Sequence, residues 1–293
     1  MKRRVLVTGG GGFIGGHMVV LLSSMRPRVK VVSLDLAKGP PIPRVAQVAC
    51  DLMDRAETVA AIHAIRPTHC VHAAAILGSG CDDNPTIARN VYEALLSTPS
   101  ILRTIDVGSA ATFGWTGAMD CPIEARRMPR PDSAYGRSKL LQEMEALAVA
   151  SRGLHVVRVR AFNVLGPGQP GSLMPAAFID RVLAGDPADV PGHRDVRDFL
   201  DVRDLANALR TILFAKNLAS ALFLVGGGQG IVTGALALAC LAALGKAAGA
   251  INASEDRPPS WSVADSGPLR KLGWRPTYSL ADSLRDQVAA LDL

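Results

Sequence analysis

The chain has 293 residues, of which 48% are hydrophobic and 20% are charged, so it can bury a large core and is not an intrinsically disordered protein. Its net charge of +6 comes from scattered Arg and Lys, and only three Trp and three Tyr are available to stack on bases, which argues against nucleic-acid binding. A modest positive charge also suits an anionic substrate such as a nucleoside diphosphate.

The five cysteines are odd in number and show no CxxC spacing. This pattern argues against a disulfide framework and against a zinc site, so we expect no metal and a reducing, cytoplasmic environment. Residues 1–4 lead directly into a short β-like run without the apolar core of a signal peptide.

A glycine-rich turn follows the first predicted strand, Arg4–Thr8, and precedes an apolar helix. Gly9, Gly12 and Gly15 form a GxxGxxG pattern between the two elements. The first glycine permits a tight turn, the next lets the backbone approach a pyrophosphate, and the last lets helix and strand pack closely. The pattern therefore predicts a dinucleotide site, to which we assign Gly9, Gly12, Phe13, Ile14 and Gly15.

The second predicted strand, Val29–Leu34, ends at Asp35, twenty residues after Gly15. A carboxylate there can accept a hydrogen bond from the 2′-hydroxyl of an adenosine ribose and would repel a 2′-phosphate. The cofactor is therefore expected to be NAD, with NADP kept open because Lys38 lies nearby.

Further candidate cofactor contacts follow the next predicted elements. Strands are expected over Val45–Ala49 and Cys70–Ala75, and a helix over Ile87–Leu96. Small residues at a strand end let a cofactor lie against the backbone, whereas His72 has no metal-like partner and is interpreted as structural. The contacts assigned here are Asp51, Leu52, Ala73, Ala74, Ala75 and Asn90.

Two candidate catalytic segments come next. A strand over Ile101–Val107 is followed by Ser109, and ligands bind at the carboxyl ends of the strands in such sheets. A helix capped by Ser133 then carries Tyr135 and Lys139 four residues apart, on one helical face. A lysine there favours the tyrosinate and makes the tyrosine a usable acid or base. The same helix is expected to bury a stripe formed by Leu140, Leu141, Met144 and Leu147.

The C-terminal part begins after a sixth predicted strand, Leu154–Arg160. Leu218–Gly245 contains no Asp, Glu, Lys or Arg and is long enough to span a bilayer. Its glycines at 226–228 and 230 favour instead a buried strand, Leu222–Val225, a turn and a helix capped by Thr233, so no membrane association is expected. A last helix is predicted over Leu280–Leu291.

Several motifs, in order along nearly the whole chain, resemble those of the extended short-chain dehydrogenase/reductase family that modifies nucleotide sugars. The matching elements are Thr8-Gly9-x-x-Gly12-Phe13-Ile14-Gly15, His72-Ala73-Ala74-Ala75, Ser109 four residues before Phe113-Gly114, Tyr135-Gly136-Arg137-Ser138-Lys139, Arg160-Ala161-Phe162-Asn163-Val164-Leu165-Gly166-Pro167-Gly168, Arg197-Asp198-Phe199 and Leu272-Gly273-Trp274-x-Pro276.

The resemblance implies a fold, a division of the chain and an assembly. It implies an α/β fold with a Rossmann-type, doubly wound parallel sheet and a smaller C-terminal α/β lobe. Residues 1–162 would bind NAD(P) and 163–293 mainly the nucleotide sugar, with about 198–216 returning to the first domain. It also implies a homodimer joined by a four-helix bundle that uses the Tyr135 helix and the Ile87–Leu96 helix.

The resemblance also implies roles for single residues. Tyr135 would be the catalytic acid or base, Lys139 would lower its pKa and hold the nicotinamide ribose, and Ser109 would bond the reacting oxygen. The substrate would be a nucleoside diphosphate sugar, held by Asn163, Arg197 and Arg257, because charge-assisted donors suit phosphate oxygens.

The reaction type has alternatives. Sugar 4,6-dehydratases of the family carry an Asp-Glu pair where this chain has Ala110-Ala111, and the Cys of GDP-fucose synthases is absent beside Ser109. The chain most resembles GDP-4-keto-6-deoxymannose reductases, so a 4-keto-6-deoxyhexose nucleotide reductase acting at C4 is the first expectation. Asp35 instead suits an NAD-dependent 4-epimerase. A non-catalytic dinucleotide sensor is the third alternative, although it would not need Ser109, Tyr135 and Lys139.

Overall fold

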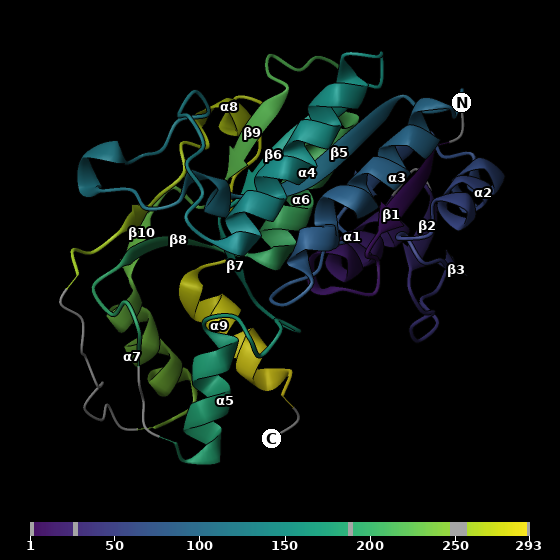
Figure 1. Ribbon diagram of the computed structural model, residues 1–293. Helices are drawn as coiled ribbons and strands as arrows, with labels where there is room; N and C mark the ends of the chain where they lie inside the picture. The colour runs from purple at the N-terminus through teal and green to yellow at the C-terminus, as the bar shows by residue number, and fades with distance from the viewer. Residues whose placement is uncertain (1–2, 26–28, 187–189, 247–256, 292–293) are drawn as a thin grey trace.

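Seven parallel strands form the main sheet of the computed structural model, which describes residues 3–25, 29–186, 190–246 and 257–291 (Figure 1). Their order across the sheet is β3-β2-β1-β4-β5-β6-β9. The strands are β1 (Arg4–Thr8), β2 (Lys30–Asp35), β3 (Val45–Ala49), β4 (His69–His72), β5 (Arg103–Ser109), β6 (Val156–Ala161) and β9 (Leu222–Val225).

Helices cover both faces of this sheet. The described helices are α1 (Phe13–Ser24), α2 (Arg55–Ile65), α3 (Asn84–Leu96), α4 (Ala134–Ala150), α5 (Ala176–Ala184), α6 (Val202–Phe214), α7 (Thr233–Ala243), α8 (Gly267–Arg270) and α9 (Leu280–Ala289), with short 3-10 turns η1 (Cys81–Asp83), η2 (Ala110–Phe113) and η3 (Ala118–Asp120). One core joins the sheet to α1 and α6, and another joins it to α2, α3 and α4. Because helices cover both faces of the sheet, side chains on both sides of a central strand are buried, and the sequence of such a strand is continuously apolar. Val5, Leu6 and Val7 of β1 are fully buried.

The predicted fold class, a doubly wound parallel α/β sheet, is confirmed. The chain runs from β1 outward to β3 and then returns to place β4 on the other side of β1. This reversal opens a crevice at the carboxyl ends of β1 and β4, where open α/β sheets bind ligands. The glycine-rich turn after β1 lies at that point.

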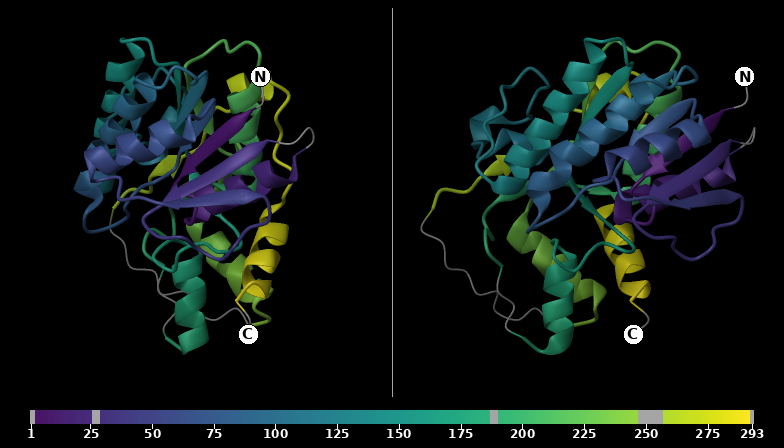
Figure 2. Two further views of the ribbon diagram at one scale, coloured as in Figure 1. Left: turned by 90° about the vertical axis from the view of Figure 1, so that its right-hand side faces the viewer. Right: turned by 45° about the vertical axis from the view of Figure 1, so that its right-hand side comes forward.

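A second, smaller group of elements lies beyond β6. Strand β8 (Val196–Asp201) pairs with β7 (Asn163–Leu165), β10 (Gly230–Val232) and β11 (Trp261–Ser262). Helices α5, α7 and α9 surround a separate apolar cluster that includes Phe178 and Leu236. Figures 1 and 2 show these three helices grouped together on one side of the main sheet.

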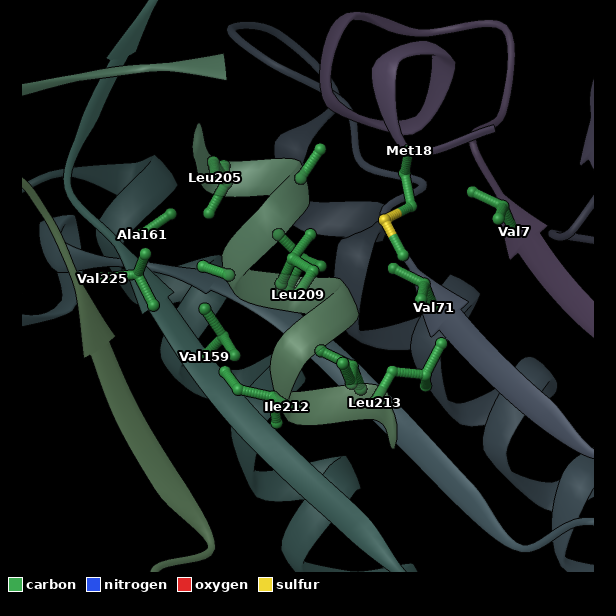
Figure 3. Close-up of a cluster of buried hydrophobic side chains, with 14 of the residues drawn as sticks. Val7, Met18, Val71, Val159, Ala161, Leu205, Leu209, Ile212, Leu213 and Val225 are labelled. Carbon is green, nitrogen blue, oxygen red and sulfur yellow. The ribbon is translucent and has the colours of Figure 1, made fainter. Parts of the chain in front are cut away.

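Helix α6 returns from the C-terminal part of the chain to pack on the main sheet (Figure 3). Its apolar side chains, Leu205, Leu209, Ile212 and Leu213, are almost fully buried against β-strand residues such as Val71 and Val159. Strand β9 also joins this sheet, beside β6. The division of the chain into domains at residues 162 and 163 stays a prediction.

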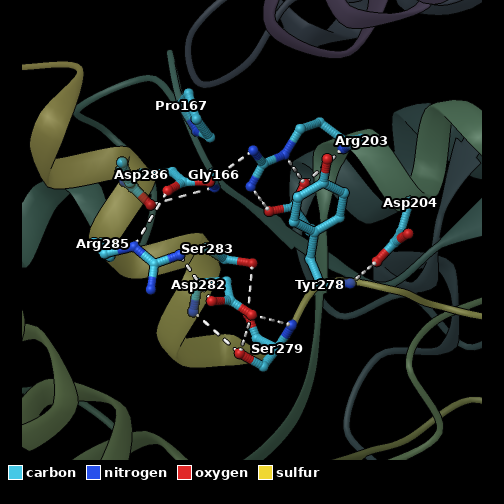
Figure 4. A network of polar contacts seen from close by, with 12 residues as sticks. Gly166, Pro167, Arg203, Asp204, Tyr278, Ser279, Asp282, Ser283, Arg285 and Asp286 are labelled. Carbon is cyan, nitrogen blue, oxygen red and sulfur yellow. Dashed lines mark hydrogen bonds and ion pairs between the residues drawn. The ribbon is translucent and has the colours of Figure 1, made fainter.

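A network of charged side chains holds α9 against the start of α6 (Figure 4). Arg203 donates to both carboxylate oxygens of Asp201 and, at 2.7 Å, to Asp286 of α9. Its guanidinium also lies 3.6 Å from the ring centroid of Tyr278. Arg203 therefore connects three segments of the C-terminal part of the chain.

Helix α4 begins as predicted but buries a different face. The Ser133 side chain accepts a hydrogen bond from the backbone N–H of Gly136, so the cap is confirmed. The expected apolar stripe is wrong, because Leu141, Met144 and Leu147 are 55%, 46% and 38% exposed. The buried face is largely polar and consists of Gly136, Ser138, Lys139, Gln142, Glu143, Ala146 and Val149.

The uncharged stretch Leu218–Gly245 contains the expected strand β9 and helix α7, and also a short strand, β10, where only a turn was predicted. The predicted cap is wrong, because Val232 is the N-cap of α7 and the Thr233 hydroxyl donates to the carbonyl oxygen of Asp195 instead. Among the residues that the structure describes, no helix is long and apolar enough to cross a membrane. All five cysteines are free thiols.

Candidate active site

A cavity of about 1450 Å³ runs along the carboxyl ends of the central strands and on to the second sheet. It is lined at one end by the turn after β1 and by Asp35, and at the other by Arg197 and Arg257. Every residue assigned from the sequence to cofactor, substrate or catalysis lines this cavity except Asn90. Segments spread from residue 9 to residue 257 are thus brought together by the sheet.

The dinucleotide end of the cavity is built by the tight turn after β1. Gly9 has a φ of +67°, which favours glycine, and a Cβ on Gly15 would lie only 2.0 Å from the carbonyl oxygen of Gly9. Gly12 is the N-cap of α1 and offers no side-chain cap to the first turn of the helix. The N–H groups of the first turn of α1, which have no acceptor within the helix, therefore suit a pyrophosphate.

Asp35 is held in place at the end of β2. One oxygen of its carboxylate accepts a hydrogen bond from Gly11 N–H and the other from Leu36 N–H, both at 2.8 Å. A carboxylate fixed there fits the 2′-hydroxyl of an adenosine ribose and repels a 2′-phosphate. These residues therefore fit NAD.

Asn90 is the predicted cofactor residue that does not line the cavity. Its amide donates to the carbonyl oxygens of Leu52 and Met53, at 2.9 and 3.1 Å, and the side chain is buried behind the cavity wall. Asn90 thus holds the backbone of the loop whose residues Asp51 and Leu52 line the cavity.

Ser109 and Tyr135 meet where η2 touches the start of α4. A Cβ on Gly136 would lie 2.5 Å from the carbonyl oxygen of Ala111, so glycine permits this close approach. Burial raises the pKa of Tyr135 to about 12, and hydrogen bonding to Ser109 acts in the opposite direction. Lys139 does not offset this rise, and the lowering of the tyrosine pKa that the resemblance implies stays a prediction. Tyr135 is therefore protonated at neutral pH and equipped as a proton donor.

Lys139 is buried one helical turn after Tyr135. Its Nζ donates to the carbonyl oxygen of Val107 at 3.1 Å and to Oε1 of Gln142 at 2.9 Å, and it lies 6.0 Å from the centroid of the Tyr135 ring. Burial lowers the pKa of Lys139 to about 8, and the charge of Asp106 opposes that fall. The lysine thus titrates close to neutral pH.

The far end of the cavity contains two arginines held by one carboxylate. Asp195 accepts from Arg197 at 2.9 Å and from Arg257 at 3.1 and 2.8 Å, and also from Ser260 N–H. Burial acts to raise the pKa of Asp195, but Arg257, Ser260 N–H and Arg197 together hold it below its usual value. Asn163 lines the same end and donates to the carbonyl oxygen of Asp198.

Asp195 was not identified from the sequence. It stands two residues before Arg197, and alternate residues next to a strand lie on one face, which is a signal that could have found it. Trp115 and Trp261 also line the cavity without having been predicted, because nothing in their local sequence indicates it. Within the described ranges, no group of three or more His, Cys, Asp or Glu could hold a metal ion.

Fold and site together define a Rossmann-type protein with a cavity that fits a dinucleotide. The sequence model of the NAD dependent epimerase/dehydratase family matches residues 5–226. The chain belongs to this family, and NAD is the cofactor that the family's name specifies and the cavity fits.

Relatives match the chain over nearly its whole length. A dTDP-glucose 4,6-dehydratase of Actinoplanes sp. is 31% identical, over 98% of this chain and 97% of the relative. A bifunctional UDP-glucose 4-epimerase and UDP-xylose 4-epimerase of Pisum sativum is 26% identical, over 98% and 95%. Nucleotide-sugar epimerases and dehydratases are therefore homologues of this protein.

Solved structures agree with this assignment. The UDP-glucose 4-epimerase of Thermus thermophilus, in complex with NAD, superposes with a TM-score of 0.84, at 30% identity and 98% coverage of both chains. MoeE5 in complex with UDP-glucuronic acid and NAD gives a TM-score of 0.85, at 26% identity and 99% coverage of both chains.

Proposed function

We propose that the protein is an NAD-dependent enzyme that transfers hydride at a hexose carbon, C4, of a nucleoside diphosphate sugar, and that C4 epimerisation is its first candidate reaction. The observation that carries the proposal is the Ser109–Tyr135 pair, placed between a cavity end that fits NAD and one that holds two arginines. Ala110 and Ala111 line the cavity beside this pair and offer no acid or base for water elimination. A 4,6-dehydratase reaction is therefore disfavoured.

The proposed chemistry divides among a few groups. Bound NAD would supply the hydride acceptor and return the hydride. Tyr135 would first have to lose its own proton, a change that the positive charges of Lys139 and of the nicotinamide would favour. As the tyrosinate it would take the proton of the C4 hydroxyl while that carbon is oxidised, and would give it back after the 4-keto sugar has turned its other face. Ser109 would bond the reacting oxygen, and Lys139 would bond the nicotinamide ribose and add positive charge.

Reduction of a 4-keto-6-deoxyhexose nucleotide is the second candidate. The raised pKa of Tyr135, about 12, suits a residue that donates a proton to a keto oxygen. The lining near Ser109 is largely apolar, with Ala110, Ala111 and Trp115, and it suits a methyl group at C6 better than a carboxylate.

One experiment separates these reactions. The purified protein is denatured, the released nucleotide is identified by mass, and the protein is then assayed with UDP-, dTDP- and GDP-sugars. Stoichiometric bound NAD and interconversion of C4 epimers without net cofactor use support the epimerase. An empty site that consumes NADH or NADPH with a 4-keto-6-deoxy sugar nucleotide supports the reductase. Cofactor binding without turnover on any sugar nucleotide overturns both and leaves the sensor.

The two arginines are proposed to hold the diphosphate of the substrate, with Asn163 beside them. Replacing Asp195 by Asn should raise KM for the nucleotide sugar about tenfold and change kcat less, because an amide NH₂ cannot accept from the guanidinium groups. Steady-state kinetics measures both constants. Asp120→Asn, which removes a carboxylate paired with Arg127 outside the cavity, is the matched control and should leave KM unchanged. A loss confined to kcat would contradict this role.

A homodimer through α3 and α4 is also proposed, because Leu141, Met144 and Leu147 form an exposed apolar row on α4. The double variant Leu141→Lys/Met144→Lys should weaken dimerisation at least about tenfold, since it would place two charges in a dry interface. Light scattering coupled to size-exclusion chromatography measures the mass. Leu238→Lys on α7, which is 44% exposed, is the control. A wild-type monomer, or a double variant that stays dimeric, contradicts the proposal.

A further inference from the structure

We propose that Asp106 is a positioning residue for Lys139: it is the buried counter-charge that orients the lysine through Gln142 and keeps it protonated. The inference rests on the proposed role of Lys139 in the active site. It extends that role to a strand residue that does not line the cavity.

A continuous set of buried hydrogen bonds joins the two residues. Lys139 Nζ donates to Gln142 Oε1 at 2.9 Å, and Gln142 Nε2 donates to Oδ1 of Asp106. Tyr92 of α3 donates to the same oxygen at 2.6 Å. Lys139, Gln142 and Asp106 are 3%, 0% and 1% exposed, so bulk water does not screen the interaction.

The fold itself gives Asp106 no structural reason to be charged. It lies in the middle of β5, opposite His72 of β4, and it faces α3 and α4, whereas the adjacent strand residues Ile105 and Val107 belong to the apolar core on the other face of the sheet. Oδ2 of Asp106 has no hydrogen-bond partner among the described residues. A buried carboxylate with hydrogen bonds to only one of its two oxygens destabilises a fold, because the other oxygen has lost its water without gaining a partner. An apolar residue at this position would not carry that desolvation cost. A functional role accounts for its presence.

The electrostatics agree with the geometry. Burial raises the pKa of Asp106 and lowers that of Lys139, and each charge opposes the shift of the other. Burial, together with the charge of Lys139, lowers the pKa of His72 to about 3, so His72 is neutral. Glu143 is paired with both Arg158 and Arg160, which leaves Asp106 as the carboxylate that acts on the lysine. The titratable and charged groups that face this cluster are Cys70 and His72 from β4, Cys81 from η1, Tyr92 from α3, Tyr135 and Glu143 from α4, and Arg158 and Arg160 from β6.

The test is a direct titration of Lys139 in the protein without substrate. The chain has seven lysines, so the ¹³Cε signals of labelled lysine can be followed by NMR, with Lys139→Arg to assign the signal. Asp106→Asn keeps the shape and the acceptor oxygen but removes the charge. We expect the titration of Lys139 to move to lower pH by about one unit, because a charged neighbour has been lost. The alkaline limb of the turnover profile should move with it.

Glu145→Gln is the matched control. Like Asp106→Asn, it removes one negative charge, but from a residue of α4 that pairs with Arg89 at the surface. It should leave the Lys139 titration in place. The exchange variant Asp106→Asn/Gln142→Glu returns the carboxylate to the same hydrogen-bonded chain and should restore the titration to wild-type pH or above. An unchanged Lys139 titration in Asp106→Asn overturns the inference.

If Asp106→Asn does not fold, the variant Lys139→Met tests the same coupling from the side of the lysine. Electrostatic coupling between two sites is mutual, so Lys139→Met should raise the pH at which the labelled Asp106 carboxyl titrates. No change there also overturns the inference. These titrations need no sugar substrate, so the proposed reaction and the role of Asp106 can fail independently.

Discussion

Replacing Tyr135 by Phe should lower kcat by about 10²–10⁴-fold, with NAD still bound. The variant keeps the ring and removes only the hydroxyl, which is the proposed proton donor and acceptor beside Ser109. The ring also packs at the start of α4, so Phe preserves the fold. Turnover with the identified sugar nucleotide and the NAD content after denaturation measure the two effects separately.

Tyr278→Phe is the matched control, because this tyrosine lies on Arg203, away from the cavity. It should leave kcat unchanged. A Tyr135→Phe protein with full turnover would remove Tyr135 from the chemistry and with it both candidate reactions.

Replacing Gly15 by Ala should abolish the dinucleotide site. The added Cβ would lie 2.0 Å from the carbonyl oxygen of Gly9 and 2.7 Å from its carbon, so the turn after β1 must move. We expect the affinity for NAD to fall more than about 100-fold and the free energy of unfolding to fall by about 1–3 kcal/mol. Calorimetric titration with NAD and thermal denaturation provide the measurements.

Gly16→Ala is a control from the neighbouring position of the same helix. Its Cβ would lie 3.7 Å from the nearest atom, which is ordinary contact. Because Ala is a better helix former than Gly by about 1 kcal/mol, Gly16→Ala should keep or slightly raise stability. Equal NAD affinities in the two variants would mean that the turn is not a cofactor cradle.

The cofactor half of the site could be predicted from the sequence because its determinants are local. The turn between β1 and α1 depends on glycine spacing within a short stretch, Gly9 to Gly15, and Asp35 depends on where one strand ends. Ser133, Tyr135 and Lys139 likewise follow from one helix and its cap. Each of these features depends on the backbone geometry of one turn, one strand end or one helix. The local sequence is enough to specify that geometry.

The burial of α4 could not be predicted in the same way. Leu141, Met144 and Leu147 have the spacing of a core stripe, yet they are exposed, while Gln142 and Glu143 are buried. Polar side chains can face a core only where distant residues satisfy them, and here Asp106 and Arg160 do so from β5 and β6. A single helix contains no information about those partners.

The sequence by itself determined the glycine turn after β1, the place of Asp35 at the end of β2, and the shared helical face of Tyr135 and Lys139, since each depends on residues close together in the chain. The doubly wound fold followed from the family resemblance that the motifs carry. Only the tertiary structure decided that Asn90 supports a loop, that Asp195 joins Arg197 to Arg257, and that Asp106 lies behind Lys139. The long-range bonds among these, from Asp106 to Gln142 and from Asp195 to Arg257, join residues that are 36 and 62 positions apart. Their geometry exists only when strands and helices have packed.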